Sequence, residues 1–339
     1  MLVKKIFKFK NLKFIPLIFL SACIENAPLD SLSPEGPYAR SIDELFWITF
    51  WIAVGVFVIV QGALLLSVFV FKEKPESPEP KQIHGNTKLE ILWTVIPALI
   101  LAAIAVPTVQ TIFDLAREPE DALKIEVIGH QWWFEYKYPD YGITTANVLV
   151  IPADKPVRLE MWSNDVLHNY WVPKLNGKRY LVPGQTTYLN LHADSPDEFW
   201  AQCGEYCGLS HSKMRGRVLS LSQKDFDIWV ANEQKNATAF SNEDLSLAAE
   251  GQQVYLNAGC TQCHVVNGVW DVQGDRIAPN LTHFAVRNVF AGAALENNRE
   301  NLTRWLANPA EVKPGTFMPN LELTESEINA LIAYLETLK

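Results

Sequence analysis

Five side chains that could bind a metal lie within one twelve-residue stretch of this 339-residue sequence. Cys203-Gly-Glu-Tyr-Cys207-Gly-Leu-Ser-His211-Ser-Lys-Met214 holds two thiols, an imidazole, a thioether and a carboxylate. Thiolate, thioether and imidazole suit copper, whereas calcium and magnesium prefer oxygen. A metal site usually needs a ligand from elsewhere as well. His168 follows a β-type run, from which a loop could bring it to the cysteines, so together they predict a copper site.

The two cysteines, four residues apart, decide which kind of copper site is expected. One cysteine with two histidines and a weak methionine binds a single copper ion for one-electron transfer. A second cysteine would allow two thiolates to bridge two copper ions. The alternative is a disulfide between Cys203 and Cys207, since disulfides form readily outside the cytoplasm. Five donors in order and a matching upstream histidine favour the metal site. Asp165, three residues before His168, either orients that histidine or forms a turn.

A second motif, Cys260-Thr-Gln-Cys263-His264, has the pattern C-x-x-C-H that attaches c-type haem. The competing interpretation is a C-x-x-C dithiol pair that happens to precede a histidine. Amphipathic helices are expected on either side, at residues 249–256 and 325–338. Between them lies Met318, in Lys-Pro-Gly-Thr-Phe-Met-Pro. This context favours a haem.

The copper stretch resembles the dinuclear copper (CuA) loop of cytochrome c oxidase subunit II, C-x-E-x-C-x-x-x-H-x-x-M, with its upstream D-V-x-H. The resemblance implies a CuA centre in a cupredoxin-like Greek-key β-barrel. In this centre, Cys203 and Cys207 would be bridging thiolates, and His168 and His211 would be imidazole ligands. Met214 would be a weak axial thioether, and Glu205 would bind through its backbone carbonyl. The Glu205 side chain would also help to bind magnesium at the interface with subunit I.

Residues 245–339 resemble class I cytochrome c, an all-α domain. The resemblance implies covalent haem attachment, with Cys260, Cys263, His264 and Met318 as the residues that hold it. Histidine and methionine together raise the potential of the iron and suit electron carriage. The Pro279 carbonyl would fix the His264 tautomer. Gly251 would let the terminal helices cross closely near Tyr334.

Two uncharged runs, residues 45–71 and 91–113, are each longer than the ~20 residues that cross a bilayer. The link between them is rich in lysine, at Lys72, Lys74, Lys81 and Lys88. By the positive-inside rule this link lies in the cytoplasm. The two spans then form a hairpin that leaves everything after residue 113 outside the cytoplasm.

The first 22 residues combine five lysines with an apolar run, which is typical of a signal peptide. Residues 20–23, Leu-Ser-Ala-Cys, resemble a bacterial lipobox. Cleavage before Cys23 and lipidation of its thiol are therefore expected. The alternative is an uncleaved start with an ordinary cysteine.

Two further residues take roles from the resemblance. Trp132, in Gln-Trp-Trp-Phe, matches the first tryptophan of the family's Q-W-x-W-x-Y segment, which is the electron entry point above the copper. Trp133 and Phe134 are interpreted as core. Glu90, at the edge of the second span, matches a glutamate at the mouth of a proton channel in subunit I; the alternative is a solvated helix-end charge. The chain departs from the family at Tyr180, where an aspartate is usual.

The region from residue 124 to 221 alternates short β-type runs with turns. The runs are 124–129, 132–138, 146–151, 157–163, 186–191, 198–202 and 217–221. This spacing predicts a β-sandwich or barrel. The predicted multidomain chain therefore has a signal peptide (1–22), a transmembrane hairpin (40–115), a cupredoxin-like domain (120–224), a helix and linker (225–245) and a cytochrome c domain (246–339).

The net charge of −9 argues against a nucleic-acid partner, because phosphates require a basic surface. The resemblance implies the electron-transfer subunit of a caa-type cytochrome c oxidase in a bacterial cell membrane. Its partners would be subunit I, other oxidase subunits and an upstream cytochrome or quinol–cytochrome reductase. Two alternatives remain: the input subunit of a CuA-containing nitric oxide reductase, and a copper-delivery protein of the periplasmic face.

Overall fold

The computed structural model describes residues 27–72, 75–76, 78–79, 82–241, 246–270 and 277–339. The expected signal peptide at 1–22, its Cys23, and Lys74 and Lys81 of the lysine-rich link lie outside the described residues.

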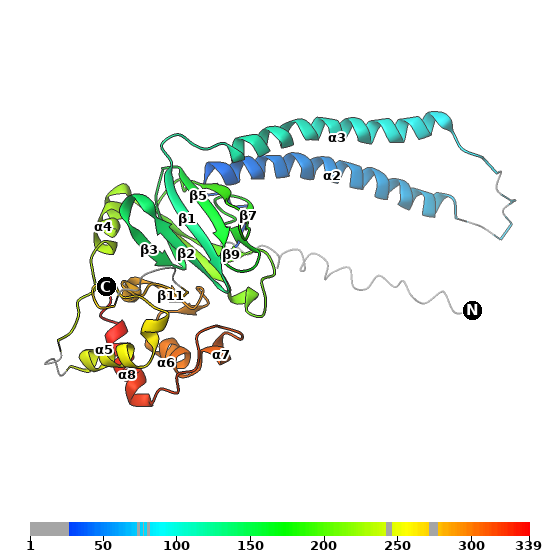
Figure 1. Ribbon diagram of the computed structural model, residues 1–339. Helices are drawn as coiled ribbons and strands as arrows, with labels where there is room; N and C mark the ends of the chain where they lie inside the picture. The colour runs from blue at the N-terminus through cyan, green and yellow to red at the C-terminus, as the bar shows by residue number, and fades with distance from the viewer. Residues whose placement is uncertain (1–26, 73–74, 77, 80–81, 242–245, 271–276) are drawn as a thin grey trace.

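Two long helices, α2 (Pro37–Val70) and α3 (Thr87–Ala116), run side by side and project from the rest of the chain (Figure 1). Their most apolar windows have mean hydropathies of 2.5 and 2.3, and neither window is buried within the chain. With 34 and 30 residues, both helices are long enough to cross a bilayer. Apolar side chains exposed on every face are unfavourable in water, so lipid is the solvent that suits this hairpin.

Polar contacts fasten the hairpin to the β domain. The Asn190 side chain donates to the carbonyl oxygens of Leu115 (3.0 Å) and Arg117 (2.7 Å), where α3 ends. Arg40, near the start of α2, forms an ion pair with Asp194. The last carbonyls of a helix have no partner within it, so Asn190 both satisfies them and fixes where α3 meets the β domain.

The middle of the chain forms two five-stranded sheets, with the orders β3-β2-β1-β5-β8 and β4-β10-β9-β6-β7. The strands are β1 (Leu123–His130), β2 (Trp133–Tyr138), β3 (Ile143–Ala146), β4 (Val148–Pro152), β5 (Val157–Ser163), β6 (His168–Trp171), β7 (Lys178–Leu181), β8 (Thr187–Leu191), β9 (Asp197–Cys203) and β10 (Arg215–Leu221). Buried aromatic and aliphatic side chains, among them Phe134, Tyr136 and Met161, fill the space between the sheets. The predicted cupredoxin-like fold is confirmed.

Three strands differ from the sequence-based expectation. His168 was expected on a loop but begins β6, and neither β6 nor β7 was predicted. Both strands have only four residues, and β6 is held by pairing with β7 and β9 rather than by a local apolar alternation. The single run expected at 146–151 is divided into β3 and β4 by Asn147, which has a left-handed φ of 65°.

The C-terminal part is a helical domain that lies against one end of the β domain (Figure 1). Its helices are α5 (Leu247–Asn257), α6 (Arg299–Ala307), α7 (Pro309–Val312) and α8 (Glu325–Leu335), with a small hairpin of β11 (Val289–Phe290) and β12 (Leu295–Glu296). Helix α4 (Gln223–Glu233) packs Phe226 and Trp229 onto the β domain. Short 3-10 turns are η1 (Pro139–Tyr141), η2 (His211–Lys213), η3 (Cys260–Gln262) and η4 (Phe284–Val286).

Helices α5 and α8 cross at the glycine that the sequence analysis singled out. A Cβ atom on Gly251 would lie 1.9 Å from the carbonyl oxygen of Ala330 and 2.8 Å from the Cβ of Tyr334. Only a residue without a side chain allows this approach. The expected close crossing is therefore confirmed.

We predict that Gly251→Ala destabilises the helical domain by about 1–3 kcal/mol, because the two backbones must separate to admit the methyl group. Urea unfolding of the purified full chain, followed by the haem absorption, measures this change. Asn257→Ala, at the exposed end of the same helix, is the control and should unfold as the wild type does. An unchanged midpoint in Gly251→Ala would contradict the crossing.

Candidate copper and haem centres

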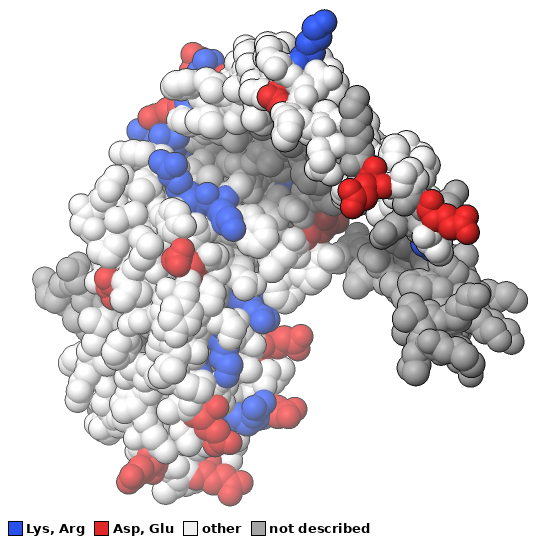
Figure 2. Space-filling model, turned by 90° about the vertical axis from the view of Figure 1, so that its right-hand side faces the viewer, with Lys and Arg blue, Asp and Glu red and all other residues white. Residues whose placement is uncertain are grey.

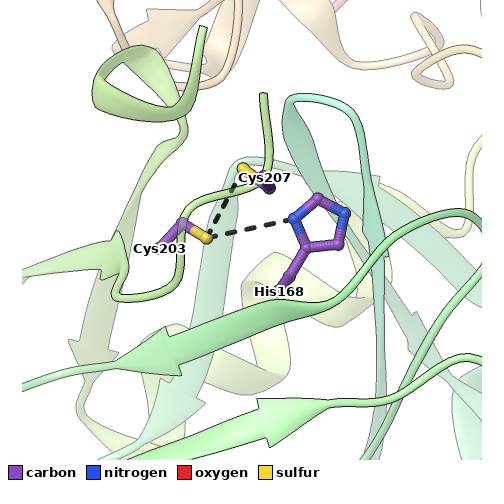
Figure 3. Close-up of side chains that lie close together, drawn as sticks. All are labelled: His168, Cys203 and Cys207. Atoms are coloured by element: carbon purple, nitrogen blue, oxygen red, sulfur yellow. Dashed lines mark hydrogen bonds between the residues drawn. The ribbon is translucent and has the colours of Figure 1, made fainter. Parts of the chain in front are cut away.

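Three of the predicted copper ligands meet at one buried point (Figure 3). Cys203 Sγ lies 3.9 Å from Nδ1 of His168 and 3.8 Å from Sγ of Cys207. Their ligand atoms all fall within 4.8 Å of one another. All three side chains are buried. A metal ion at their centre would be shielded from water.

The other three predicted donors surround the same sulfurs. Nδ1 of His211 lies 3.5 Å from Cys207 Sγ, and Sδ of Met214 lies 3.8 Å from it. The backbone oxygen of Glu205 lies 3.2 Å from Cys203 Sγ. The set is thus two thiols, two imidazole nitrogens, one thioether and one carbonyl, and this chemistry fits copper rather than a hard cation.

The alternative of a disulfide is not what the structure shows. Cys203 and Cys207 are both free thiols, and their sulfurs are 3.8 Å apart. A disulfide bond would bring them to about 2.05 Å. The separation leaves room for metal ions between and beside the sulfurs.

The second sheet positions these ligands. Cys203 ends β9 and His168 begins the neighbouring β6, where Tyr170 pairs with Cys203. The loop after Cys203 returns to its starting point, because the Cys203 amide donates to the Met214 carbonyl (3.0 Å). Cys203 and Met214, the ligands at the two ends of the loop, are therefore held by the same rigid pair of strands, β9 and β10.

Asp165 holds His168 in its orientation. Its carboxylate lies 2.7 Å from Nε2 of His168, which turns Nδ1 towards the sulfurs. The carboxylate also accepts bonds from the amides of Gln131 (2.6 Å) and Val166 (2.6 Å). Burial alone would raise the pKa of Asp165, but these bonds outweigh it and lower the pKa. A carboxylate bonded to the second ring nitrogen, as Asp165 is here, fixes the tautomer of a metal-binding histidine.

The two thiols shift each other's pKa in opposite directions. The hydrogen bond between them lowers the pKa of Cys203 and raises the pKa of Cys207. Cysteine ligands bind copper as thiolates, so copper binding would release thiol protons. Cys203 is therefore the thiol that loses its proton more readily.

Trp132 lies directly beside the cysteine loop. Its side chain is buried, and its indole N–H donates to the Cys207 carbonyl (2.9 Å). Gln131 donates to the same oxygen (2.7 Å). Trp133 and Phe134 are buried as expected. Sequence reasoning missed the contribution of Gln131, because an amide next to a tryptophan carries no distinctive signal.

The haem motif lies beside α5, on the turn η3. Cys260 and Cys263 are free thiols, and Nδ1 of His264 lies 2.8 Å from the carbonyl oxygen of Pro279, as expected. The other ring nitrogen, Nε2, would be the one to bind iron. Met318 packs against the domain's buried cluster, as does Trp305. The thiols, imidazole and thioether present here fit a c-type haem.

Glu90 lies in the first turn of α3 and is exposed. Its carboxylate accepts a bond from the Asn86 amide (3.2 Å), while the Asn86 side chain caps the amides of Lys88 and Leu89. These reciprocal bonds account for a glutamate at this helix start. In this chain, the residue therefore has a structural partner in addition to any role in proton uptake.

Three family models match the chain in order. They are the transmembrane domain of cytochrome c oxidase subunit II over residues 30–111, its periplasmic domain over 142–220, and cytochrome c over 248–339. Cytochrome c oxidase subunit 2 of Alkalihalophilus pseudofirmus is 37% identical over 339 residues, which cover 96% of this chain and 97% of that protein. The chain belongs to the cytochrome c oxidase subunit II family.

Subunit 2 of Bacillus subtilis cytochrome c oxidase is likewise 37% identical, over 78% of each chain. The crystal structure of the periplasmic domain of subunit II of Bradyrhizobium japonicum cytochrome oxidase is 25% identical, covers 35% of this chain and 97% of that one, and has a TM-score of 0.34. As a subunit II, this chain is a membrane protein that works with subunit I. Its periplasmic and cytochrome c matches imply CuA copper and haem.

We predict that Asp165→Asn lowers copper affinity by about 10–100-fold, because the His168 ring loses the partner that orients it. Competition with a copper chelator, followed by the copper absorption, measures the affinity. Asp140→Asn, on an exposed turn of the same domain, should bind copper as the wild type does. If Asp165→Asn also retained wild-type affinity, Asp165 would be only a turn residue.

Proposed function

We propose that this chain is the electron-transfer subunit of a caa-type cytochrome c oxidase. It passes electrons from haem c through dinuclear CuA to haem a in subunit I, where oxygen is reduced to water. Membership of the subunit II family supports this function. The observation that carries it is the convergence of the six donor groups around two free thiols, next to a domain with a haem-attachment motif.

The copper pair would be held by the thiolates of Cys203 and Cys207, the imidazoles of His168 and His211, the thioether of Met214 and the carbonyl of Glu205. A copper pair bound here would gain and lose one electron with little change in its ligands. The chain supports this by holding both ends of the loop on a β-ladder and by bonding His168 to Asp165.

The haem would be attached covalently and held by Cys260, Cys263, His264 and Met318. The His264–Pro279 bond fixes the proximal ring. Trp132 is the electron entry point between the two centres. Its indole N–H bonds to the Cys207 carbonyl, and the other side of its ring contacts the haem domain: a Cβ built on Gly315 would lie 2.8 Å from Cη2. The indole thus touches both domains.

The hairpin makes the chain a multi-pass protein of the bacterial cell membrane, with both soluble domains on the extracytoplasmic side. The lysines between the spans support this orientation. The proposed division of the chain is a transmembrane hairpin at 40–115, a copper domain at 120–224, a helix and linker at 225–245 and a cytochrome c domain at 246–339. We also propose that the thiol of Cys23 is lipidated and that Glu90 lies at the mouth of a proton channel in subunit I. The Glu205 side chain would help to bind magnesium together with subunit I.

The external donor is an upstream cytochrome or a quinol–cytochrome reductase with a basic surface. Residues 246–339 contain ten acidic and six basic side chains. Figure 2 shows acidic side chains gathered towards the lower end of the molecule, where Figure 1 places the helical domain. Complementary charge would speed the encounter.

The proposal predicts a dinuclear, mixed-valence copper signal in electron paramagnetic resonance of the intact copper-loaded subunit. Cys207→Ser should abolish that signal, because one bridging thiolate is lost. Ser212→Ala, an exposed change in the same loop, should retain it. A single-ion copper signal in the wild type would favour copper delivery. Oxygen rather than nitric oxide consumption by the assembled complex would separate the oxidase from the reductase.

We predict that Trp132→Phe slows electron transfer from haem to copper on the order of tenfold or more, the scale at which small misplacements slow a reaction. The phenyl ring lacks the N–H that bonds Cys207 and is too short to span both domains. Flash-induced absorption changes in the assembled complex measure the rate. Trp229→Phe is the control, since Trp229 packs on Tyr138 and helix α4 instead. Equal rates in both variants would exclude Trp132 from the route.

A further inference from the structure

A buried lysine joins the haem domain to the copper domain. Lys313 follows α7 and is only 4% exposed. Its Nζ atom donates to the backbone oxygens of Trp132 (2.5 Å), in the copper domain, and Ala291 (2.8 Å), in its own domain. A buried lysine is rare unless its polar end is satisfied. This one reaches the backbone of the tryptophan proposed to admit electrons.

Further contacts surround this lysine in the interface. Lys213 of the copper domain reaches in the opposite direction and donates to the Val312 carbonyl. Ser210 donates to the Pro314 carbonyl (2.7 Å), and the Arg215 amide donates to the Gly292 carbonyl (2.8 Å). Each of these bonds links a copper-domain residue to one of two haem-domain loops, at 291–292 and 312–314.

The same loop carries the proposed haem ligand. Lys313 is five residues before Met318, and between them Gly315 touches the Trp132 ring. Gly315 has φ of +80°, and a Cβ on it would also lie 3.1 Å from Cδ1 of Leu209. Because these residues share one loop, the position of Lys313 also fixes where the Met318 loop lies relative to the Trp132 indole.

Backbone carbonyl oxygens are the acceptors at Lys313, so an ammonium and a neutral amine can both donate to them. Burial and the nearby Lys213 cation lower the pKa of Lys313 to about 7. The bonds persist in either protonation state. The contact is also buried, which makes it insensitive to salt, unlike docking through surface charges.

We infer that Lys313 is a positioning residue for electron transfer within the chain, holding the Met318 loop against Trp132. This inference rests on the proposed function. Lys313 touches neither metal ligand set directly; it acts through the backbone of Trp132 and Ala291. Its removal should leave each centre intact and affect only the passage between them.

The test is Lys313→Met in the assembled oxidase, because methionine keeps much of the apolar stem and removes the donor. A photoexcited ruthenium dye supplies one electron to the haem. Absorption then shows one electron leaving the haem and one arriving at the copper pair. Loss of two buried hydrogen bonds shifts the equilibrium away from the held position of the Met318 loop on the order of tenfold or more. We therefore expect the haem-to-copper transfer rate to fall by a similar factor. Lys339→Met, at the exposed C-terminus, is the control.

A second readout does not depend on electron transfer. Hydrogen exchange of the Arg215 amide, whose acceptor is Gly292 across the interface, should be faster in Lys313→Met and unchanged in Lys339→Met. Unchanged transfer and unchanged exchange would overturn the inference, as would loss of haem or copper from Lys313→Met, since Lys313 would then serve folding. Absence of any haem-to-copper transfer in the wild type would instead refute the proposed function.

Discussion

Two cysteine sulfurs held 3.8 Å apart in a buried loop are the constraint on which the rest of the structure depends. Two thiolates at this distance repel each other, and the neighbouring Cys203 accordingly raises the pKa of Cys207. Positively charged copper bound here would offset that repulsion. The loop can hold the sulfurs this close because both its ends belong to neighbouring strands of one sheet.

Polar side chains that satisfy backbone atoms help to attach the copper domain to its neighbours. Asn190 caps the end of α3, and Lys313 caps carbonyl oxygens of Trp132 and Ala291. Apolar burial holds each domain together internally but has no fixed direction. Hydrogen bonds to backbone oxygens do have direction, and they therefore set how the membrane hairpin, the copper domain and the haem domain are oriented. The proposed electron transfer depends on that orientation.

Short strands held by pairing with other strands explain where sequence reasoning failed. His168 begins β6, a four-residue strand whose neighbours β7 and β9 come later in the chain. Its pairing is invisible to any local pattern, although the histidine itself was recognised as a ligand. Helices α6 and α7 were not predicted either, since they have only nine and four residues.

The sequence by itself determined the chemistry and the order of the parts. Donor types and spacing in 203–214 and 260–264, and the uncharged lengths of 45–71 and 91–113, are local properties that survive without a fold. The spacing of Asp165 and His168 left two roles open for Asp165, and only the tertiary structure decided that it turns Nδ1 of His168 to the sulfurs. Tertiary structure alone brought Lys313 to Trp132, 181 residues away in sequence. That contact is set by the packing of distant segments, and no spacing of residue types encodes it.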